Sequence, residues 1–198
     1  MRVLGIDPGN EGGLVLLSER GEIASAWPMP RAHGRVNWRG VLALLQTAYD
    51  RNVQVAVERQ MPFTRKDGAG AGGGAGMMMA GTIAMLENYG RLKLCIELAG
   101  DWPVTEIMPG SWRASYRPRK GALGASPVAV PGETPATRVE AANRANKKAS
   151  VAIADAMWPL ARLKMGTTWT EGTAEAALIA EYLRRQQRAA SLQQEGRA

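Results

Sequence analysis

The stretch Arg2–Gly13, RVLGIDPGNEGG, places one carboxylate, Asp7, between an apolar run and a Gly/Pro turn. The apolar residues at 3–6 predict a short buried strand. The Pro/Gly-rich residues at 8–13 predict a tight turn into a second apolar run, Leu14–Leu17. We therefore expect a hairpin with Asp7 near its middle, where a buried carboxylate needs a cation or hydrogen-bond donors. Taken alone, Asp7 could also simply cap its own turn.

Further strands extend this hairpin into a sheet. Residues 22–27 alternate in polarity and predict a third strand, which completes an antiparallel meander. Helical spacing of apolar residues predicts a crossover helix within 36–51, and alternating valines predict a strand over 53–58. A right-handed crossover lays that strand parallel to the first, which brings Glu58 and Asp7 to one end of the sheet. Two carboxylates placed together repel each other unless a proton or a cation lies between them.

The middle of the chain contains a glycine-rich segment. Residues 59–76 are mostly Gly, Ala and Met, which predicts a loop, and a helix is expected over 77–89. The loop contains a GxGxxG spacing. Because neither an acidic ribose partner nor a P-loop Lys-Ser/Thr follows it, we expect no nucleotide cofactor. Residues 92–98 and 104–108 predict two more strands.

The following segment, residues 109–137, is rich in Pro, Gly and basic residues, which predicts an irregular conformation. A helix is expected over 138–157 because its apolar residues recur at helical spacing and Pro159 stops its continuation.

The final helix is expected to start near Thr168, with a polar tail over 191–198. Thr168 and Glu171 fit a capping box, so Glu171 could be a helix cap. Glu171 and Glu175 are four residues apart and share one face, where like charges oppose the helix. A divalent cation between them would remove that conflict.

Length, composition and net charge limit the kinds of protein that this chain can be. The 198 residues suit one domain over 1–190, and no apolar run approaches the roughly 20 residues that cross a bilayer, so we expect a cytoplasmic protein. A single cysteine, Cys95, and a single histidine, His33, exclude cysteine-rich and histidine-based metal sites. The net charge of +7 indicates an anionic partner, although a solvated basic face is the alternative.

Four carboxylates on three expected elements, Asp7, Glu58, Glu171 and Glu175, predict a site for Mg²⁺ or Mn²⁺ held by oxygen ligands. Paired ions of this kind can activate a water and stabilise the leaving oxygen of a phosphodiester. They would also relieve the repulsion between an anionic substrate and the acidic residues of the protein.

Five segments occur in an order that resembles the RuvC-type Holliday junction resolvases of the ribonuclease H-like superfamily, especially their phage-encoded branch. The segments are GIDPGNEGGLVLL (5–17), VAVERQ (55–60), MPGSWRASY (108–116), KKASVAIADAMWP (147–159) and EGTAEAALIAEYL (171–183). The family usually has Asp or His at the position of Glu171.

The resemblance implies an α/β fold with a mixed five-stranded sheet flanked by helices, the meander coming first and the parallel strands after it. It implies a homodimer through the helix at 77–89 and two divalent metals per active site, held by Asp7, Glu58, Glu171 and Glu175. Lys147 or Lys148 would contact the scissile region. The expected reaction is a pair of nicks across a four-way DNA junction that leaves 5′-phosphate and 3′-hydroxyl ends.

The candidate DNA contacts are basic side chains, which bind phosphates, and aromatic side chains, which stack on bases. They are Phe63, Arg65, Lys66, Trp112, Arg113, Arg117, Arg119, Lys120, Arg144, Lys147 and Lys148. Phe63 could instead anchor its loop to the core.

Two other hypotheses remain open. A non-catalytic junction-binding protein would share the basic surface and use the carboxylates as caps and turn residues. An actin-like kinase would need a second phosphate-binding turn and a Gly-rich adenosine motif, and the sequence has neither.

Overall fold

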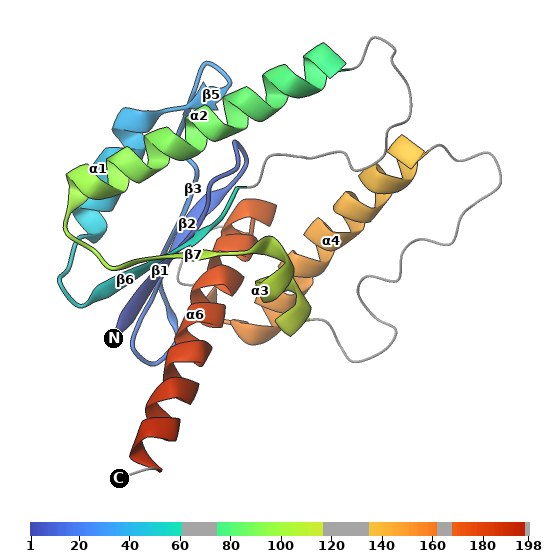
Figure 1. The fold of residues 1–198 in the computed structure, drawn as a ribbon. Helices are drawn as coiled ribbons and strands as arrows, with labels where there is room; N and C mark the ends of the chain where they lie inside the picture. Colours follow the sequence, from blue (N-terminus) through green and yellow to red (C-terminus); the bar gives the residue numbers. More distant parts are fainter. Residues whose placement is uncertain (61–74, 117–134, 162–167, 197–198) are drawn as a thin grey trace.

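A five-stranded mixed sheet forms the centre of the molecule, with strand order β3-β2-β1-β6-β7 (Figure 1). The computed structural model describes residues 1–60, 75–116, 135–161 and 168–196, with side chains from 82 and from 145 onward in the second and third ranges. The strands are β1 (Arg2–Asp7), β2 (Gly13–Leu17), β3 (Ile23–Pro28), β6 (Val53–Glu58) and β7 (Val104–Ile107). The first three are antiparallel neighbours, whereas β6 and β7 run parallel to β1. The predicted α/β fold with a meander followed by parallel strands is confirmed.

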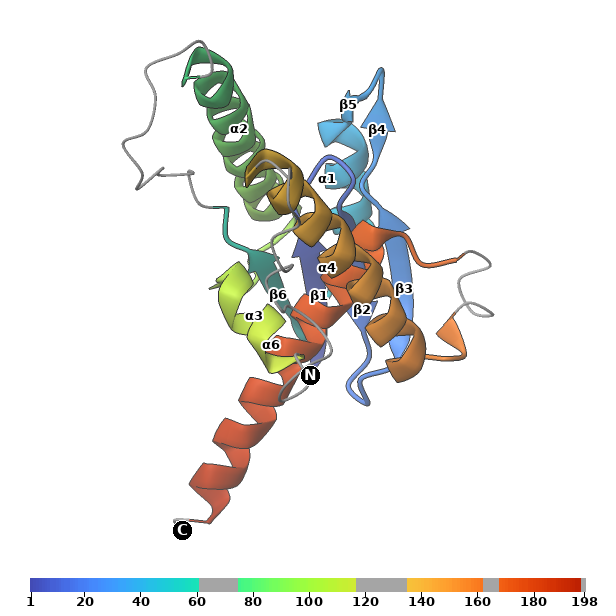
Figure 2. The same cartoon turned by 90° about the vertical axis from the view of Figure 1, so that its right-hand side faces the viewer.

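Helices cover both faces of the sheet (Figures 1 and 2). On one face, α1 (Trp38–Ala48) and α2 (Ala75–Ala99) enclose a core that includes Leu4 and Ile6. On the other, α3 (Pro109–Ser115), α4 (Pro135–Met157) and α6 (Glu171–Glu195) enclose a core that includes Val3. Because side chains of a strand alternate between faces, Asp7 and Glu58 belong to the α6 side.

The close approach of α6 to the sheet depends on small residues. Gly5 lies in β1 beneath α6, and a side chain there would collide with the Ala176 carbonyl oxygen and the Ala180 side chain. Ala174, Ala176, Ala177 and Ala180 are fully buried in this contact. The first turn of α6 therefore lies beside the β1–β2 turn, where Gly12 and Gly172 form an isolated bridge.

The helix α2 differs from its prediction. It was expected to end at 89 and to be followed by a strand over 92–98, but it continues to Ala99. In the helix, Leu92, Cys95 and Ile96 face the core at helical spacing. The predicted strand is therefore wrong, whereas β7 matches the prediction for 104–108 closely.

The region at 109–137 is only partly as predicted. Residues 109–115 form the short helix α3, which begins with Pro109 in its first turn, where proline is well accommodated. The helix α4 starts at Pro135 rather than 138. The irregular part that was expected between them falls at 117–134, outside the described residues, as do residues 61–74 of the glycine-rich loop.

The start and end of α6 also correct the prediction. Its N-cap is Thr170, whose hydroxyl accepts from the Thr173 amide, while the Thr173 hydroxyl accepts from the Thr170 amide. The predicted capping box from Thr168 to Glu171 is therefore wrong, and Glu171 is not the cap. The helix continues to Glu195, into the segment predicted as a polar tail, and its last turns extend beyond the sheet (Figure 1).

No helix in the described ranges is both long and apolar enough to span a membrane.

Candidate active site

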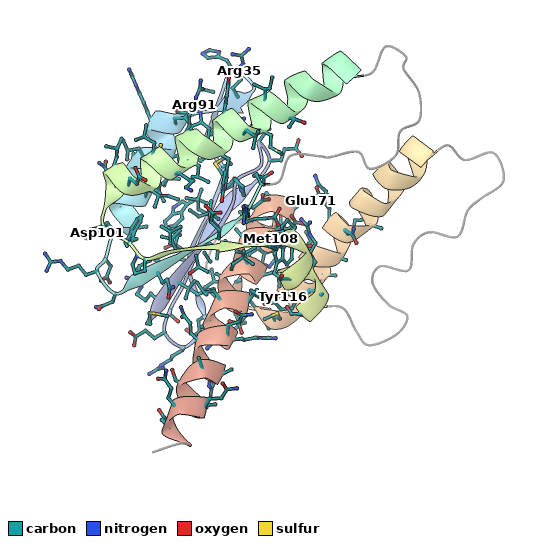
Figure 3. All side chains as sticks on the ribbon, in the orientation of Figure 1. Arg35, Arg91, Asp101, Met108, Tyr116 and Glu171 are labelled. Carbon is teal, nitrogen blue, oxygen red and sulfur yellow. The ribbon has the colours of Figure 1, made fainter. Side chains whose placement is uncertain are left out.

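The four predicted carboxylates line one open cleft of about 490 Å³. Asp7 and Glu58 are the last residues of the adjacent parallel strands β1 and β6, so both lie at the same end of the sheet. Glu171 and Glu175 come from the first two turns of α6 and share one face of it. Figure 3 shows Glu171 at the N-terminal end of α6.

Asp7 is held by its own turn and surrounded by like charges. Its Oδ1 accepts a hydrogen bond from the Gly9 amide at 3.1 Å, as expected for a carboxylate that starts a turn. Burial, together with repulsion from Glu175 and Glu58, raises the pKa of Asp7 to about 7. Asp7 therefore both caps its turn and belongs to the charged site. Nearby cations do not fully balance the negative charges of Asp7, Glu58 and Glu175.

Arg113 lies between two of the carboxylates. One of its terminal nitrogens is 3.3 Å from Glu58 Oε2 and also 3.3 Å from Glu175 Oε2. Its guanidinium stacks on the Trp112 ring, with 4.7 Å between Cζ and the ring centroid. Burial raises the pKa of Glu58, while Arg113 and the Trp112 hydrogen bond act in the opposite direction. Arg113 is thus a built-in counter-ion for this half of the cleft.

Trp112 has a different role from the predicted one. It was expected to stack on DNA, but only 1% of it is exposed, and its Nε1 donates to Glu58 Oε2 at 2.7 Å. The short helix α3 turns this ring into the core while it turns Arg113 toward the cleft. The predicted DNA contact by Trp112 is therefore wrong, and the residue orients Glu58 instead.

The helix α4 contacts both acids of α6. Ser150, which is buried, donates from Oγ to Glu175 Oε1 at 3.2 Å. Lys147 Nζ lies 2.9 Å from Glu171 Oε2 and 3.7 Å from Glu11 Oε2. The hydrogen bond with Glu171 is the main cause that raises the pKa of Lys147. Of the two predicted lysines, Lys147 lines the cleft, whereas Lys148 is exposed and does not.

The remaining predicted DNA contacts are not placed by the structure. Phe63, Arg65 and Lys66 lie outside the described residues, and so do Arg117, Arg119 and Lys120. Arg144 belongs to α4, but its side chain is not among those described.

Four polar residues of the site were not predicted from the sequence: Asn10, Glu11, Arg31 and Ser150. Glu11 belongs to the same turn as Asp7, so its proximity could have been inferred. Ser150 lies three residues after Lys147, which places both on one face of α4. Nothing in the sequence pattern predicts that Arg31 lies at the cleft, because the short strand that carries it comes close to the other site residues only in the folded protein.

The donor chemistry of the cleft fits a hard divalent cation. All the predicted ligands are carboxylates, and burial together with repulsion from Glu175 and Glu58 raises the pKa of Asp7. Among the described residues, no three acidic, histidine or cysteine side chains form a ready-made metal site. Glu58 and Glu175 contact Arg113 instead, so the positive charge between these two carboxylates is the guanidinium of Arg113.

In comparisons with known proteins, no family model matches the chain and no curated protein matches it.

Proposed function

We propose that the protein is a metal-dependent endonuclease with a ribonuclease H-like fold that cuts four-way DNA junctions, as RuvC-type resolvases do. The observation that carries the proposal is the convergence of Asp7, Glu58, Glu171 and Glu175 on one cleft, although they are far apart in the sequence. The order of strands around β1 agrees with the sheet that the resemblance implies.

In this proposal, Asp7, Glu58, Glu171 and Glu175 hold two Mg²⁺ or Mn²⁺ ions. When bound, the ions supply water activation and neutralise charge on the scissile phosphate. The backbone of the Asp7 turn and Trp112 fix the orientation of two carboxylates, while Ser150 fixes a third. Positioned donors of this kind hold ligands in place without reorganisation during the reaction.

The basic residues at the cleft have separate tasks. Lys147 lies where it can contact the substrate phosphate beside Glu171, and Arg113 can do so from the Glu58 side. The products would be nicked strands with 5′-phosphate and 3′-hydroxyl ends. Because two nicks across a junction need two sites, we also propose a homodimer. The exposed apolar residues Ile83 and Leu86 of α2 lie within the predicted dimer helix and support this arrangement.

The decisive experiment is cleavage of a synthetic four-way junction by Glu58→Gln protein in Mg²⁺. Glutamine keeps an oxygen that accepts from Trp112 but removes the charge that a metal needs, so cutting should fall by at least about 100-fold while junction binding persists. Glu97→Gln, an exposed acid on α2, is the matched control and should cut normally.

Wild-type cutting by the Glu58→Gln protein would show that the site is wrong. A wild-type protein that shifts junctions in gels but yields no products in any metal would instead favour a non-catalytic junction-binding protein.

A further inference from the structure

We propose that the small hairpin formed by β4 (Arg31–Ala32) and β5 (Arg35–Val36) is a DNA-binding element. In this inference, which rests on the proposed function, Arg31 and Arg35 bind backbone phosphates of a duplex arm that enters the cleft. Neither Arg31 nor Arg35 was among the DNA contacts predicted from the sequence.

The hairpin has a defined shape. Arg31 pairs with Val36 and Ala32 pairs with Arg35, which leaves a two-residue turn of His33 and Gly34. Both turn residues have positive φ, 50° and 75°, as in the type I′ turn that fits the twist of paired strands. A tight turn of this type presents its flanking side chains at fixed positions, which favours phosphate binding by lowering the entropy lost on contact.

The base of the hairpin is attached to the candidate active site. The Met29 amide donates to the Gly12 carbonyl at 2.9 Å, and Gly12 belongs to the same turn as Asp7. The Asn37 amide donates to the Pro30 carbonyl at 2.8 Å, which closes the other side of the base. Val36 is buried in the core beneath it. The position of the hairpin relative to Asp7 is therefore set by the backbone.

Arg31 lines the cleft together with the four carboxylates. Three basic side chains line it among the described residues: Arg31, Arg113 and Lys147. Arg113 and Lys147 both form ion pairs with acids of the site, whereas Arg31 forms none with a described residue. Its guanidinium donates one long hydrogen bond, 3.5 Å, to the Gly34 carbonyl of the same hairpin. Arg31 is thus a cleft cation whose charge is available to a ligand.

The sequence that follows Arg31 is also basic. Residues 31–49 contain Arg31, Arg35 and Arg39 and no acidic residue. Arg35 and Arg39 are exposed, and neither forms an ion pair within the described part of the chain. Figure 3 shows Arg35 projecting outward at the end of the hairpin. Since cross-strand partners share a face, Arg35 is on the face opposite Arg31, so the two arginines can reach successive phosphates on either side of the hairpin.

The chemistry that fits this surface is a nucleic-acid backbone. An acid-lined cleft repels phosphates, so cations at its rim must hold the anionic substrate close enough to react. The hairpin and α4 lie apart at this end of the molecule (Figures 1 and 2), with Arg31 on one and Lys147 on the other. A DNA strand bound between them would have its backbone above the carboxylates.

The test measures DNA binding as a function of salt concentration, in the Glu58→Gln background with Mg²⁺, on a four-way junction and on a linear duplex. Each phosphate contact adds about 0.9 to the slope of log K against log salt for duplex DNA. The double substitution Arg31→Gln/Arg35→Gln should lower that slope by about 2 and weaken binding roughly tenfold or more at 0.1 M salt. Arg20→Gln is the matched control, because Arg20 is exposed in the turn between β2 and β3, at the other end of the sheet.

A second measurement does not depend on removing the arginines. Ala32→Cys introduces an exposed thiol on the hairpin, while the natural Cys95 is buried. It should form a disulfide with DNA that carries a thiol tethered to a phosphate, and Arg20→Cys should not.

An unchanged salt slope for the double variant overturns the inference, as does an equal loss for Arg20→Gln or the absence of cross-linking at position 32. These results would leave the proposed nuclease intact, because the Glu58→Gln protein would still bind junctions without cutting them. If the Glu58→Gln protein binds no DNA, the proposed function fails as well. If the double variant loses slope but wild-type protein never cuts, the hairpin is confirmed as a DNA-binding element and only the nuclease proposal fails.

Discussion

At the scale of single residues, Asp7 has the clearest measurable consequence. Its pKa is raised from 3.8 to about 7 by burial and by Glu175 and Glu58, so the folded protein binds this proton more tightly than the unfolded chain does. Stability from this group is therefore fully present below about pH 4 and is lost as the pH rises through about 7. In EDTA, Asp7→Asn should raise the free energy of unfolding, and the increase should be larger at pH 8 than at pH 5 by on the order of 2 kcal/mol.

Thermal unfolding at the two pH values measures this effect, and a change of that size shifts Tm by several degrees in a chain of this length. Asp101→Asn is the control, because Asp101 is an exposed carboxylate just after α2, between that helix and β7 (Figure 3). A gain for Asp7→Asn that is the same at pH 5 and pH 8 would contradict the electrostatic explanation.

Among the residues of the candidate site, the two acids at the ends of strands could be placed most directly from the sequence. Asp7 and Glu58 could be placed together because each ends an apolar strand and a right-handed crossover brings the two ends into register. Trp112 and Arg113 could not be placed correctly, because their directions depend on the short helix α3, which the Pro/Gly-rich composition concealed. Without that helix, neither the hydrogen bond to Glu58 nor the bridge to Glu175 could be inferred.

At the scale of elements, the contact between α6 and β1 determines where two of the acids lie. Gly5→Ala places a methyl group against the Ala176 carbonyl and the Ala180 side chain, so α6 must move away from the sheet. Overpacking of this kind typically costs about 1–3 kcal/mol, and we expect a matching fall in Tm. Because Glu171 and Glu175 move with the helix, junction cleavage should also fall.

Gly110→Ala provides the comparison. Gly110 lies in α3, and apart from the adjacent helix backbone no atom of the described residues lies within 4 Å of the added methyl group, so its substitution should leave stability unchanged or raise it by about 0.5 kcal/mol. Differential scanning calorimetry of both variants would decide the matter. Equal stability of the two would show that the α6 contact tolerates an added methyl group.

The error over 92–98 has a simple physical origin. Leu92, Leu94, Ile96 and Leu98 alternate with other residues and therefore fit a strand pattern. The helical pattern is carried by Leu92, Cys95 and Ile96, while Leu94 and Leu98 remain exposed on α2. Both periods fit seven residues, and only packing against α1 and the sheet selects the helix.

At the scale of the whole molecule, the proposed dimer makes a prediction about α2. Ile83 and Leu86 are 49% and 42% exposed and lie three residues apart on one face of α2, where a second copy of the helix could cover them. If α2 pairs with its copy, Leu86→Glu should place two charges in the interface and weaken dimerisation at least about tenfold. Sedimentation equilibrium would measure the dissociation constant.

Leu192→Glu serves as the matched variant, because Leu192 is similarly exposed on the part of α6 that extends beyond the sheet. A wild-type protein that sediments as a monomer at every concentration would refute the dimer. Equal effects of the two substitutions would place the interface elsewhere.

The overall topology was the most predictable feature. The strand order follows from two rules, that consecutive antiparallel strands pair and that a crossover helix returns the chain parallel and right-handed. The resemblance added the helical layers. The β4–β5 hairpin was not predicted, because a pair of two-residue strands leaves no periodic signal in the sequence.

Trp112 belongs to two environments at once. Its ring packs among apolar side chains on the α6 side of the sheet, its nitrogen donates to Glu58, and its face supports Arg113. One side chain thus belongs both to the hydrophobic core and to the candidate active site. Phenylalanine or leucine at this position would leave part of the space empty and would also remove the hydrogen bond that orients Glu58. The choice of amino acid at position 112 is therefore limited by the candidate active site as well as by the core, although Trp112 is buried.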